Sequence, residues 1–217
     1  MTAEMTSPGL SAEQGHLIAE AAERLRLQFD GRVNAETVDR FLSDSVKTLT
    51  DRATAMTWIP LLAEHVARDR LRALVRLETD VADLNPSVLF LCTHNAGRSQ
   101  MAAGWMRHYG GDQVAVFSGG SQPRDEVNSV AVEAMSEKGI DISEEVPQPW
   151  ADEVVRAADV VVSMGCSDVC PIYPGRRYVD WDLDDPSGQP IDVVRRIRDE
   201  LEVRVQGLLA EMVPVNS

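Results

Sequence analysis

The sequence contains no long run of apolar residues. Within its 217 residues, no apolar stretch approaches the roughly 20 residues that a membrane-spanning helix needs. The first residues, Met1 to Met5, also lack the basic and apolar regions of a secretory signal. We therefore expect a protein that has no membrane partner and works in the cytoplasm.

Positive charge is also scarce. The chain has 21 lysines and arginines against 35 aspartates and glutamates, which gives a formal net charge of −14. Proteins that bind the phosphate backbone of nucleic acids need basic patches, and anionic membranes attract basic surfaces. The composition argues against both kinds of partner, and it is compatible with an enzyme that has one local site for a small anion.

Cysteine is rare, and the few cysteines are unevenly placed. The chain has three cysteines, an odd number, and all of them lie in its second part, at Cys92, Cys166 and Cys170. In a cytosolic protein such a set indicates catalytic or redox chemistry rather than a framework of structural disulfides.

The first 80 residues show the pattern of three amphipathic helices. Ser11 and Gln14 form a capping-box pattern, Asn34 can cap a second helix, and a third begins near Thr57. The expected apolar faces are Leu17, Ala21, Leu25 and Phe29; then Val38, Phe41, Leu42, Val46 and Leu49; then Leu62, Val66, Ala73, Leu74 and Leu77. Each helix has one stripe to bury, so residues 1–80 are predicted to form a small three-helix bundle. It carries no recognisable chemistry, and we expect it to mediate homodimerisation.

From residue 87 to residue 217, short apolar segments alternate with helical patterns. The expected strands are 88–91, 114–118, 159–163 and 178–181, and the expected helices are 100–109, 128–138, 149–158 and 191–212. This alternation predicts an α/β domain, with a four-stranded parallel sheet and helices on both faces. Ligands of such sheets bind beyond the carboxyl ends of the strands, where Cys92 falls.

The stretch from Val88 to Met101 organises this second domain. Four apolar residues lead into Cys92, a polar loop with one glycine follows, and Arg98 opens a helix. Backbone N–H groups and the dipole at a helix N-terminus bind anions, and an arginine can contact two oxygens of an oxyanion at once. The same surroundings, with a hydrogen bond from Ser99, would stabilise a thiolate at Cys92. The alternative for Cys92 is a buried structural cysteine.

The motif Cys92-x5-Arg98-Ser99, with Asn95 and a downstream Asp185-Pro186, resembles the low-molecular-weight protein tyrosine phosphatase superfamily, which includes the thiol-dependent arsenate reductases. The resemblance covers roughly residue 87 to the C-terminus, and the extra helical segment before it is similar to the arrangement in some actinobacterial-type arsenate reductases. It implies that Cys92 is the nucleophile and that Asp185, among several neighbouring acids, is the general acid. The oxyanion-binding residues would be Thr93, His94, Asn95, Ala96, Gly97, Arg98 and Ser99.

Cys166 and Cys170 are four residues apart and can come within bridging reach if their loop turns. Two free thiols are one alternative. A zinc site that also uses Cys92 and a histidine is another, but the spacing is wider than the common one and there is no second pair. We expect no metal and no bound cofactor. Many thioredoxin-coupled members of the superfamily carry a glutamate that serves a potassium site, and Ala103 stands at the matching position here.

These residues suggest the reduction of arsenate to arsenite, for arsenic detoxification. Cys92 would attack arsenic, Arg98 and the loop amides would stabilise the charge, and Asp185 would protonate the departing oxygen. Cys166 and then Cys170 would regenerate Cys92 by thiol–disulfide exchange. By resemblance the external reductant is thioredoxin, and an arsenate–mycothiol transferase remains an alternative.

Two further hypotheses of function compete with that of an arsenate reductase. A protein tyrosine phosphatase of this superfamily usually has tyrosines after the Asp-Pro pair, whereas Ser187 and Gly188 follow here, and the pair Cys166 and Cys170 would have no task. The other hypothesis is a non-catalytic module that senses oxyanions, with the helical bundle as its output, and the complete set of nucleophile, arginine and acid argues against it. We therefore favour the reductase.

Overall fold

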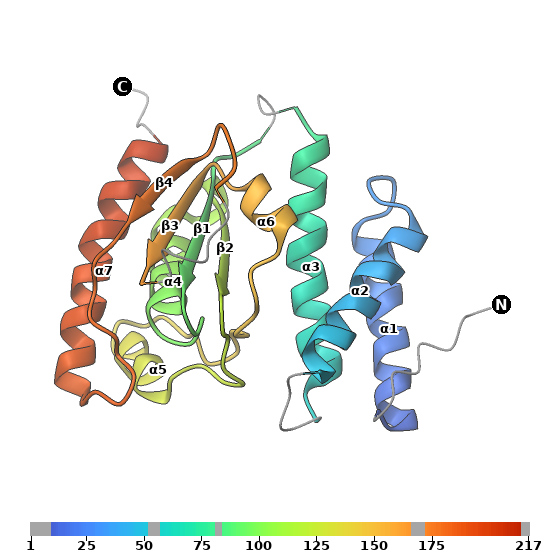
Figure 1. The fold of residues 1–217 in the computed structure, drawn as a ribbon, viewed down its shortest axis with the longest axis horizontal. Helices are drawn as coiled ribbons and strands as arrows, with labels where there is room; N and C mark the ends of the chain where they lie inside the picture. Colours follow the sequence, from blue (N-terminus) through green and yellow to red (C-terminus); the bar gives the residue numbers. More distant parts are fainter. Residues whose placement is uncertain (1–9, 52–56, 81–83, 166–171, 214–217) are drawn as a thin grey trace. The chain divides into compact units, whose positions relative to one another are not determined.

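The computed structural model of the chain describes residues 10–51, 57–80, 84–165 and 172–213. The chain divides into two compact units, residues 1–79 and residues 80–217 (Figure 1). Each unit is described by itself. Among the described helices, none combines the length and the apolar character needed to cross a bilayer.

The first unit consists of three helices, α1 (Ala12–Gln28), α2 (Ala35–Thr50) and α3 (Ile59–Glu78). The hydroxyl of Ser11 accepts a hydrogen bond from the backbone N–H of Gln14 at 3.2 Å, and the Gln14 side chain accepts one from the Ser11 N–H at 2.9 Å. The side chain of Asn34 caps α2 by accepting a hydrogen bond from the N–H of Thr37 at 2.8 Å. The prediction of three helices is confirmed.

The core of this unit differs in part from the predicted apolar faces. Leu17 is 42% exposed, so its predicted place in the core is wrong, and its neighbour Ile18 is fully buried instead. On α3 the core residues are Ile59, Ala63, Ala67 and Leu71, and of the predicted face only Leu74 packs against them. This helix carries two apolar stripes. The predicted core face is the stripe with the larger side chains. The stripe that forms the core contains Ala63 and Ala67, which are four residues apart.

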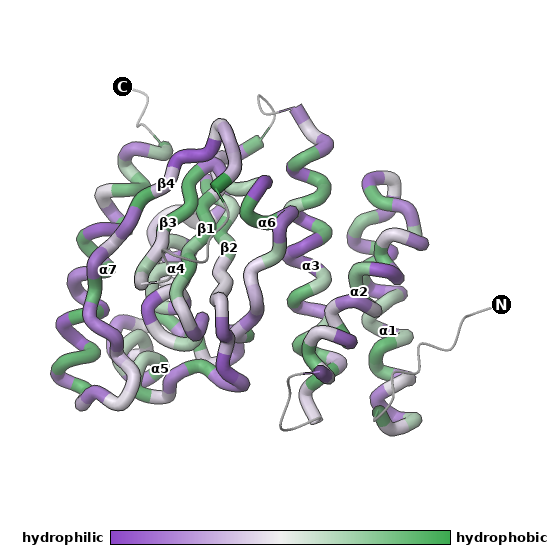
Figure 2. Tube along the Cα trace, in the orientation of Figure 1, coloured by the Kyte–Doolittle hydropathy of each residue, from purple (hydrophilic) through white to green (hydrophobic). Residues whose placement is uncertain are grey.

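The second unit contains a parallel sheet of four strands, β1 (Ser87–Cys92), β2 (Ala115–Gly120), β3 (Val160–Met164) and β4 (Arg177–Asp180), in the order β2-β1-β3-β4. The predicted α/β fold with a four-stranded parallel sheet is confirmed. All residues of the central strand β1 are buried, and Figure 2 shows its hydrophobic character. The register places Cys92 between Gly120 of β2 and Met164 of β3, at the carboxyl edge of the sheet.

The helices of this unit are α4 (Arg98–Gly110), α5 (Ser129–Ser136), α6 (Asp152–Ala157) and α7 (Ile191–Met212), with a short 3-10 turn, η2 (Gly111–Gln113). Helices α4 and α7 pack against each other, and both contribute to the core with Phe90 and Trp181, while α6 contacts β1. The predicted helix 149–158 is too long. Its first residues are extended because Pro149 forms a β-bridge with Gly120, so the helix begins only at Asp152.

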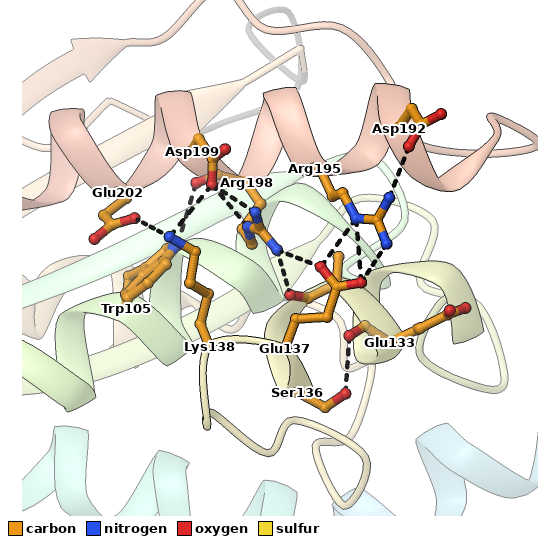
Figure 3. Close-up of polar contacts among 11 residues, drawn as sticks. Trp105, Glu133, Ser136, Glu137, Lys138, Asp192, Arg195, Arg198, Asp199 and Glu202 are labelled. Carbon is orange, nitrogen blue, oxygen red and sulfur yellow. Dashed lines mark hydrogen bonds and ion pairs between the residues drawn. The ribbon is translucent and has the colours of Figure 1, made fainter.

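An ion-pair network joins the end of α5 to α7 (Figure 3). The carboxylate of Glu137 accepts hydrogen bonds from Arg195 Nε at 3.0 Å and from Arg198 Nη1 at 2.9 Å. Arg198 is buried, and its Nη1 also donates to the carbonyl of Ala134 at 2.7 Å. Hydrogen bonds from Arg195 and then Arg198 lower the pKa of Glu137 from 4.5 to about 2. The network therefore fixes α5 against α7.

Candidate active site

Residues 92–98, here called the phosphate loop, connect β1 to α4 at the carboxyl edge of the sheet. Cys92 is the last residue of β1, and α4 begins at Arg98. Within the loop, Asn95 has a φ angle of 46°, which lies in the left-handed region. Asparagine tolerates this region better than most residues because its short polar side chain can form local hydrogen bonds. The loop thus turns sharply at Asn95 and brings the N–H of this residue toward the sulfur.

The sulfur of Cys92 has two polar neighbours. Its Sγ lies 3.0 Å from Ser99 Oγ and accepts a hydrogen bond from the backbone N–H of Asn95 at 3.2 Å. Ser99 Oγ itself accepts a hydrogen bond from Asn95 Nδ2 at 2.9 Å, so the hydroxyl hydrogen of Ser99 is available for the sulfur. Cys92 is 2% exposed. Two donors on a buried sulfur stabilise the thiolate, which is the reactive form of cysteine.

Asn95 is held by two glutamines that the sequence analysis did not single out. Its Oδ1 accepts hydrogen bonds from the backbone N–H of Gln148 at 2.8 Å and from Gln100 Nε2 at 3.3 Å. Both glutamines are buried. The sequence gives little signal for Gln100, because it shows only a polar residue near the start of the helix after the loop. That this turn of the helix is buried is seen in the structure. Gln148 contributes through its backbone, for which a sequence carries no signal.

The end of β2 lies close against the phosphate loop. A Cβ atom at Gly120 would lie 2.8 Å from the carbonyl oxygen of Thr93 and 2.9 Å from the backbone nitrogen of Asn95. Because both are backbone atoms, the contact could not be relieved by moving a side chain. Gly120 is therefore needed for the loop to adopt this path.

Arg98 is buried beside the phosphate loop and reaches a second loop, residues 182–187, here called the acid loop. Its Nη2 donates to Asp185 Oδ2 at 3.1 Å, and its Nη1 donates to the carbonyl of Leu183 at 3.3 Å. A Cβ atom at Gly165 would lie 2.9 Å from Nη1, so the glycine after β3 leaves room for the guanidinium. The structure thus pairs two of the predicted catalytic residues, Arg98 and Asp185, next to the loop that begins at Cys92, a third.

The acid loop packs directly on the phosphate loop. A Cβ atom at Gly97 would lie 2.6 Å from Pro186 Cγ, which shows how closely the two loops approach. Asp185 Oδ1 accepts a hydrogen bond from the backbone N–H of Ser187 at 2.9 Å, so both carboxylate oxygens of Asp185 have partners. Among the described acids of the loop, Asp185 is the one that pairs with Arg98. This placement fits an acid that serves the same group as the arginine.

Residues 122–128, here called the brace, hold the other side of the phosphate loop. Their backbone N–H groups donate to three carbonyls of that loop, from Gln122 to Thr93 at 2.7 Å, from Arg124 to His94 at 3.1 Å and from Asn128 to Ala96 at 2.8 Å. The carbonyls of Thr93, His94 and Ala96 are therefore paired with the brace rather than directed at an anion in the site. His94 takes part through its backbone carbonyl.

Cys166 and Cys170 lie outside the described residues. Cys166 follows Gly165 in the sequence, directly after strand β3, whose Met164 is paired with Cys92. Within the described part of the chain, no group of histidine, cysteine, aspartate and glutamate side chains could hold a metal ion. Ala103 is fully buried on α4.

Similar proteins match either the second unit or nearly the whole chain. An arsenate reductase of Halalkalibacterium halodurans is 42% identical over 128 residues, which cover 55% of this chain and 91% of the relative. The solved thioredoxin-dependent arsenate reductase of Corynebacterium glutamicum is 41% identical, with a TM-score of 0.79, and the match covers 91% of this chain and 96% of that one. A low-molecular-weight protein tyrosine phosphatase of T. tengcongensis is 28% identical, with a TM-score of 0.54, over 58% of this chain and 99% of that one.

Two family models match the chain. Residues 18–75 match the N-terminal domain of protein-tyrosine-phosphatase-like proteins. Residues 87–214, more than half of the chain, match the low molecular weight phosphotyrosine protein phosphatase model and include every described residue of the candidate site. The chain therefore belongs to the low molecular weight phosphotyrosine protein phosphatase family.

Proposed function

We propose that this protein is an arsenate reductase that works through a covalent bond between Cys92 and arsenic. The observation that carries the proposal is the position of the Cys92 sulfur, which lies beside two donors at the end of β1, in a loop followed at once by the Arg98–Asp185 pair. Arsenate has the tetrahedral shape and charge of phosphate, so a loop built for a phosphoryl group also accepts arsenate.

In the first step, the Cys92 thiolate attacks arsenic and an arsenic–oxygen bond breaks. Asp185 gives its proton to the departing oxygen, which leaves as water, while Arg98 and the loop N–H groups stabilise the charge on the remaining oxygens. In the second step, the thiol of Cys166 attacks Cys92 Sγ, and its proton passes to an oxygen of the departing arsenic group. The electron pair of the sulfur–arsenic bond stays with arsenic, which leaves as arsenite, and a Cys92–Cys166 disulfide forms.

In the third step, Cys170 attacks Cys166, which frees Cys92 and leaves a Cys166–Cys170 disulfide for an external dithiol. Thioredoxin is our candidate for that dithiol. The support comes from the similarity over nearly the whole chain to a thioredoxin-dependent arsenate reductase. Because the relay needs reduced thiols, we place the enzyme in the cytoplasm.

Hydrolysis of a phosphate ester is the second candidate function, and the similarity to a protein tyrosine phosphatase favours it. Ser187 follows the Asp185-Pro186 pair and offers no aromatic face for a phenyl ring. The cysteines at 166 and 170 have no role in hydrolysis. An arsenate–mycothiol transferase would also use Cys92, Arg98 and Asp185, and it would not need the other two cysteines.

We also propose that residues 87–217 carry the reaction and that residues 1–80 mediate homodimerisation. Leu27, Trp58 and Leu61 in the helical unit are more than half exposed, and large apolar side chains on a surface favour association. In sedimentation velocity, we expect the full chain to run as a dimer and residues 80–217 alone to run as a monomer. Equal behaviour of the two would remove this part of the proposal.

The function is tested by following arsenate-dependent NADPH oxidation with thioredoxin and thioredoxin reductase. We expect turnover by the intact chain, none by Cys92→Ser, and loss of multiple turnovers in Cys166→Ser and Cys170→Ser. Turnover unaffected by either of the last two substitutions would contradict the relay.

Two further arms separate the alternatives. Turnover that requires mycothiol and mycoredoxin would indicate the transferase route. Hydrolysis of p-nitrophenyl phosphate without any arsenate reduction would indicate a phosphatase.

A further inference from the structure

Arg124 and Ser187 connect two loops at the edge of the candidate site. Arg124 Nη2 donates to Ser187 Oγ at 2.9 Å. Arg124 belongs to the brace, and its own backbone N–H donates to the carbonyl of His94 in the phosphate loop. Ser187 belongs to the acid loop, and its backbone N–H donates to Asp185. The bond between Arg124 and Ser187 is here called the rim bond. It links the brace, which is bonded to the phosphate loop, to the acid loop, which contains Asp185.

The two ends of the rim bond have fixed positions. The brace is tied to the phosphate loop by three backbone hydrogen bonds, and Asn128 Nδ2 lies 3.5 Å from the carbonyl of Pro186, which it contacts as a donor. Pro186 rests on Gly97. The rim bond thus completes a set of contacts that holds the acid loop close to the phosphate loop. Its donor is an exposed arginine and its acceptor is a neutral hydroxyl.

The location of the rim bond determines which part of a ligand would meet it. A tetrahedral anion places three oxygens against the loop N–H groups and Arg98, and its fourth substituent must point toward Asp185, which protonates it. Ser187 stands two residues after Asp185, and its backbone N–H donates to that carboxylate. The rim bond therefore lies beside the acid toward which the fourth substituent points. A single oxygen is small enough to stop short of the bond, whereas a phenyl ring would have to displace it.

We propose that Arg124 and Ser187 form a specificity-determining pair, which closes the acid loop over the site and favours inorganic tetrahedral oxyanions over aryl-substituted ones. This inference rests on the proposed function, because it assigns the substrate class of the same site. The pair explains how a fold that is shared with a protein tyrosine phosphatase can be restricted to a small anion. The space next to Asp185 is occupied by the hydrogen bond between Arg124 and Ser187.

The test compares two anions that differ only in the fourth substituent, inorganic phosphate and phenylphosphonate. The full-length, reduced protein is alkylated with iodoacetamide, and the modification of Cys92 is followed by peptide mass spectrometry. The concentration of each anion that halves the alkylation rate of Cys92 measures its binding. In the intact protein, we expect phosphate to protect at a lower concentration than phenylphosphonate.

In Arg124→Ala and in Ser187→Ala, we expect the preference for phosphate over phenylphosphonate to fall by about threefold to tenfold, the range that corresponds to one ordinary hydrogen bond. The double variant should show no further change, because either substitution removes the same bond. Arg196→Ala is the matched control. Arg196 is also an exposed arginine beside the acid loop, lining a depression with Asp185 and Ser187, and among the described residues no hydrogen bond or ion pair joins it to the brace.

An unchanged preference in Arg124→Ala and Ser187→Ala, with phosphate still protecting Cys92, would overturn the inference and leave the proposed function intact. An equal change in Arg196→Ala would also overturn it, because the effect would then come from charge alone. If phosphate does not protect Cys92 in the intact protein, the oxyanion site itself is wrong, and the inference falls with it.

Discussion

Ser99→Ala tests whether the hydroxyl beside Cys92 activates the sulfur. In the structure, Ser99 Oγ lies 3.0 Å from Cys92 Sγ and 2.9 Å from Asn95 Nδ2. The substitution removes the donor to the sulfur and the acceptor of the Asn95 amide, and it leaves the backbone N–H of Asn95 as the one described donor to the sulfur. Both losses occur at buried residues, where water does not replace the missing group.

The size of the effect follows from the charge on the sulfur. A hydrogen bond to a charged group contributes about 1.5–3 kcal/mol, and each 1.36 kcal/mol is a factor of ten in rate. The rate at which Cys92 reacts with iodoacetamide at neutral pH should therefore fall by about 10- to 150-fold. The amide of Asn95, left without its acceptor, should lower the free energy of unfolding by about 1–3 kcal/mol.

The assay is the rate of Cys92 alkylation, followed by peptide mass spectrometry so that the other two cysteines do not interfere, together with urea unfolding. Thr93→Val is the matched control, because Thr93 is in the same loop and its hydroxyl donates to the carbonyl of Gly165 rather than to the sulfur. We expect the control to change the alkylation rate by less than about threefold. Alkylation of Ser99→Ala at the rate of the intact protein, or an equal fall in Thr93→Val, would refute the reasoning.

Two further predictions concern the residues that support the site. The pKa of Glu137 is lowered to about 2, so its ion pairs stabilise the folded state above pH 4.5, and this contribution is lost as the pH falls from about 4.5 to about 2. Urea unfolding at pH 6 and pH 3 should show that Glu137→Gln is less stable than the intact protein at pH 6 and that the difference narrows at pH 3; an equal difference at both values would be contrary to the assignment. Gly120→Ala should weaken phosphate binding in calorimetry by at least about tenfold and lower stability by about 1–3 kcal/mol, because its Cβ would meet the backbone of the phosphate loop. Gly15→Ala, with nothing within 4 Å of the added Cβ, should leave binding unchanged.

The sequence predicted the elements whose signals are local. The strand before Cys92 was recognised from a run of four apolar residues, and the final helix was predicted with the bounds Ile191 and Met212 that the structure has. The position of Cys92 at the carboxyl edge followed from the alternation of strands and helices, because parallel strands end together. These features depend on periodicity and on the order of elements along the chain.

Other features depend on contacts between distant segments, and the sequence carried little signal for them. The helix expected from Pro149 begins only at Asp152, because Pro149 pairs with Gly120 of β2. Gln148 holds Asn95 through a backbone N–H, which every non-proline residue has. On α3, two apolar stripes were compatible with the pattern, and only the packing of the bundle selects the one that contains Ala63 and Ala67.

The most direct test of the account is a single turnover without any external reductant. The fully reduced protein is mixed with excess arsenate, and arsenite and free thiols are counted per chain. The account predicts one arsenite released and two thiols lost per chain, because two electrons pass from two cysteines to one arsenic, and it predicts no arsenite from Cys92→Ser. Absence of arsenite from the intact, folded protein, or arsenite formed equally by Cys92→Ser, would contradict it.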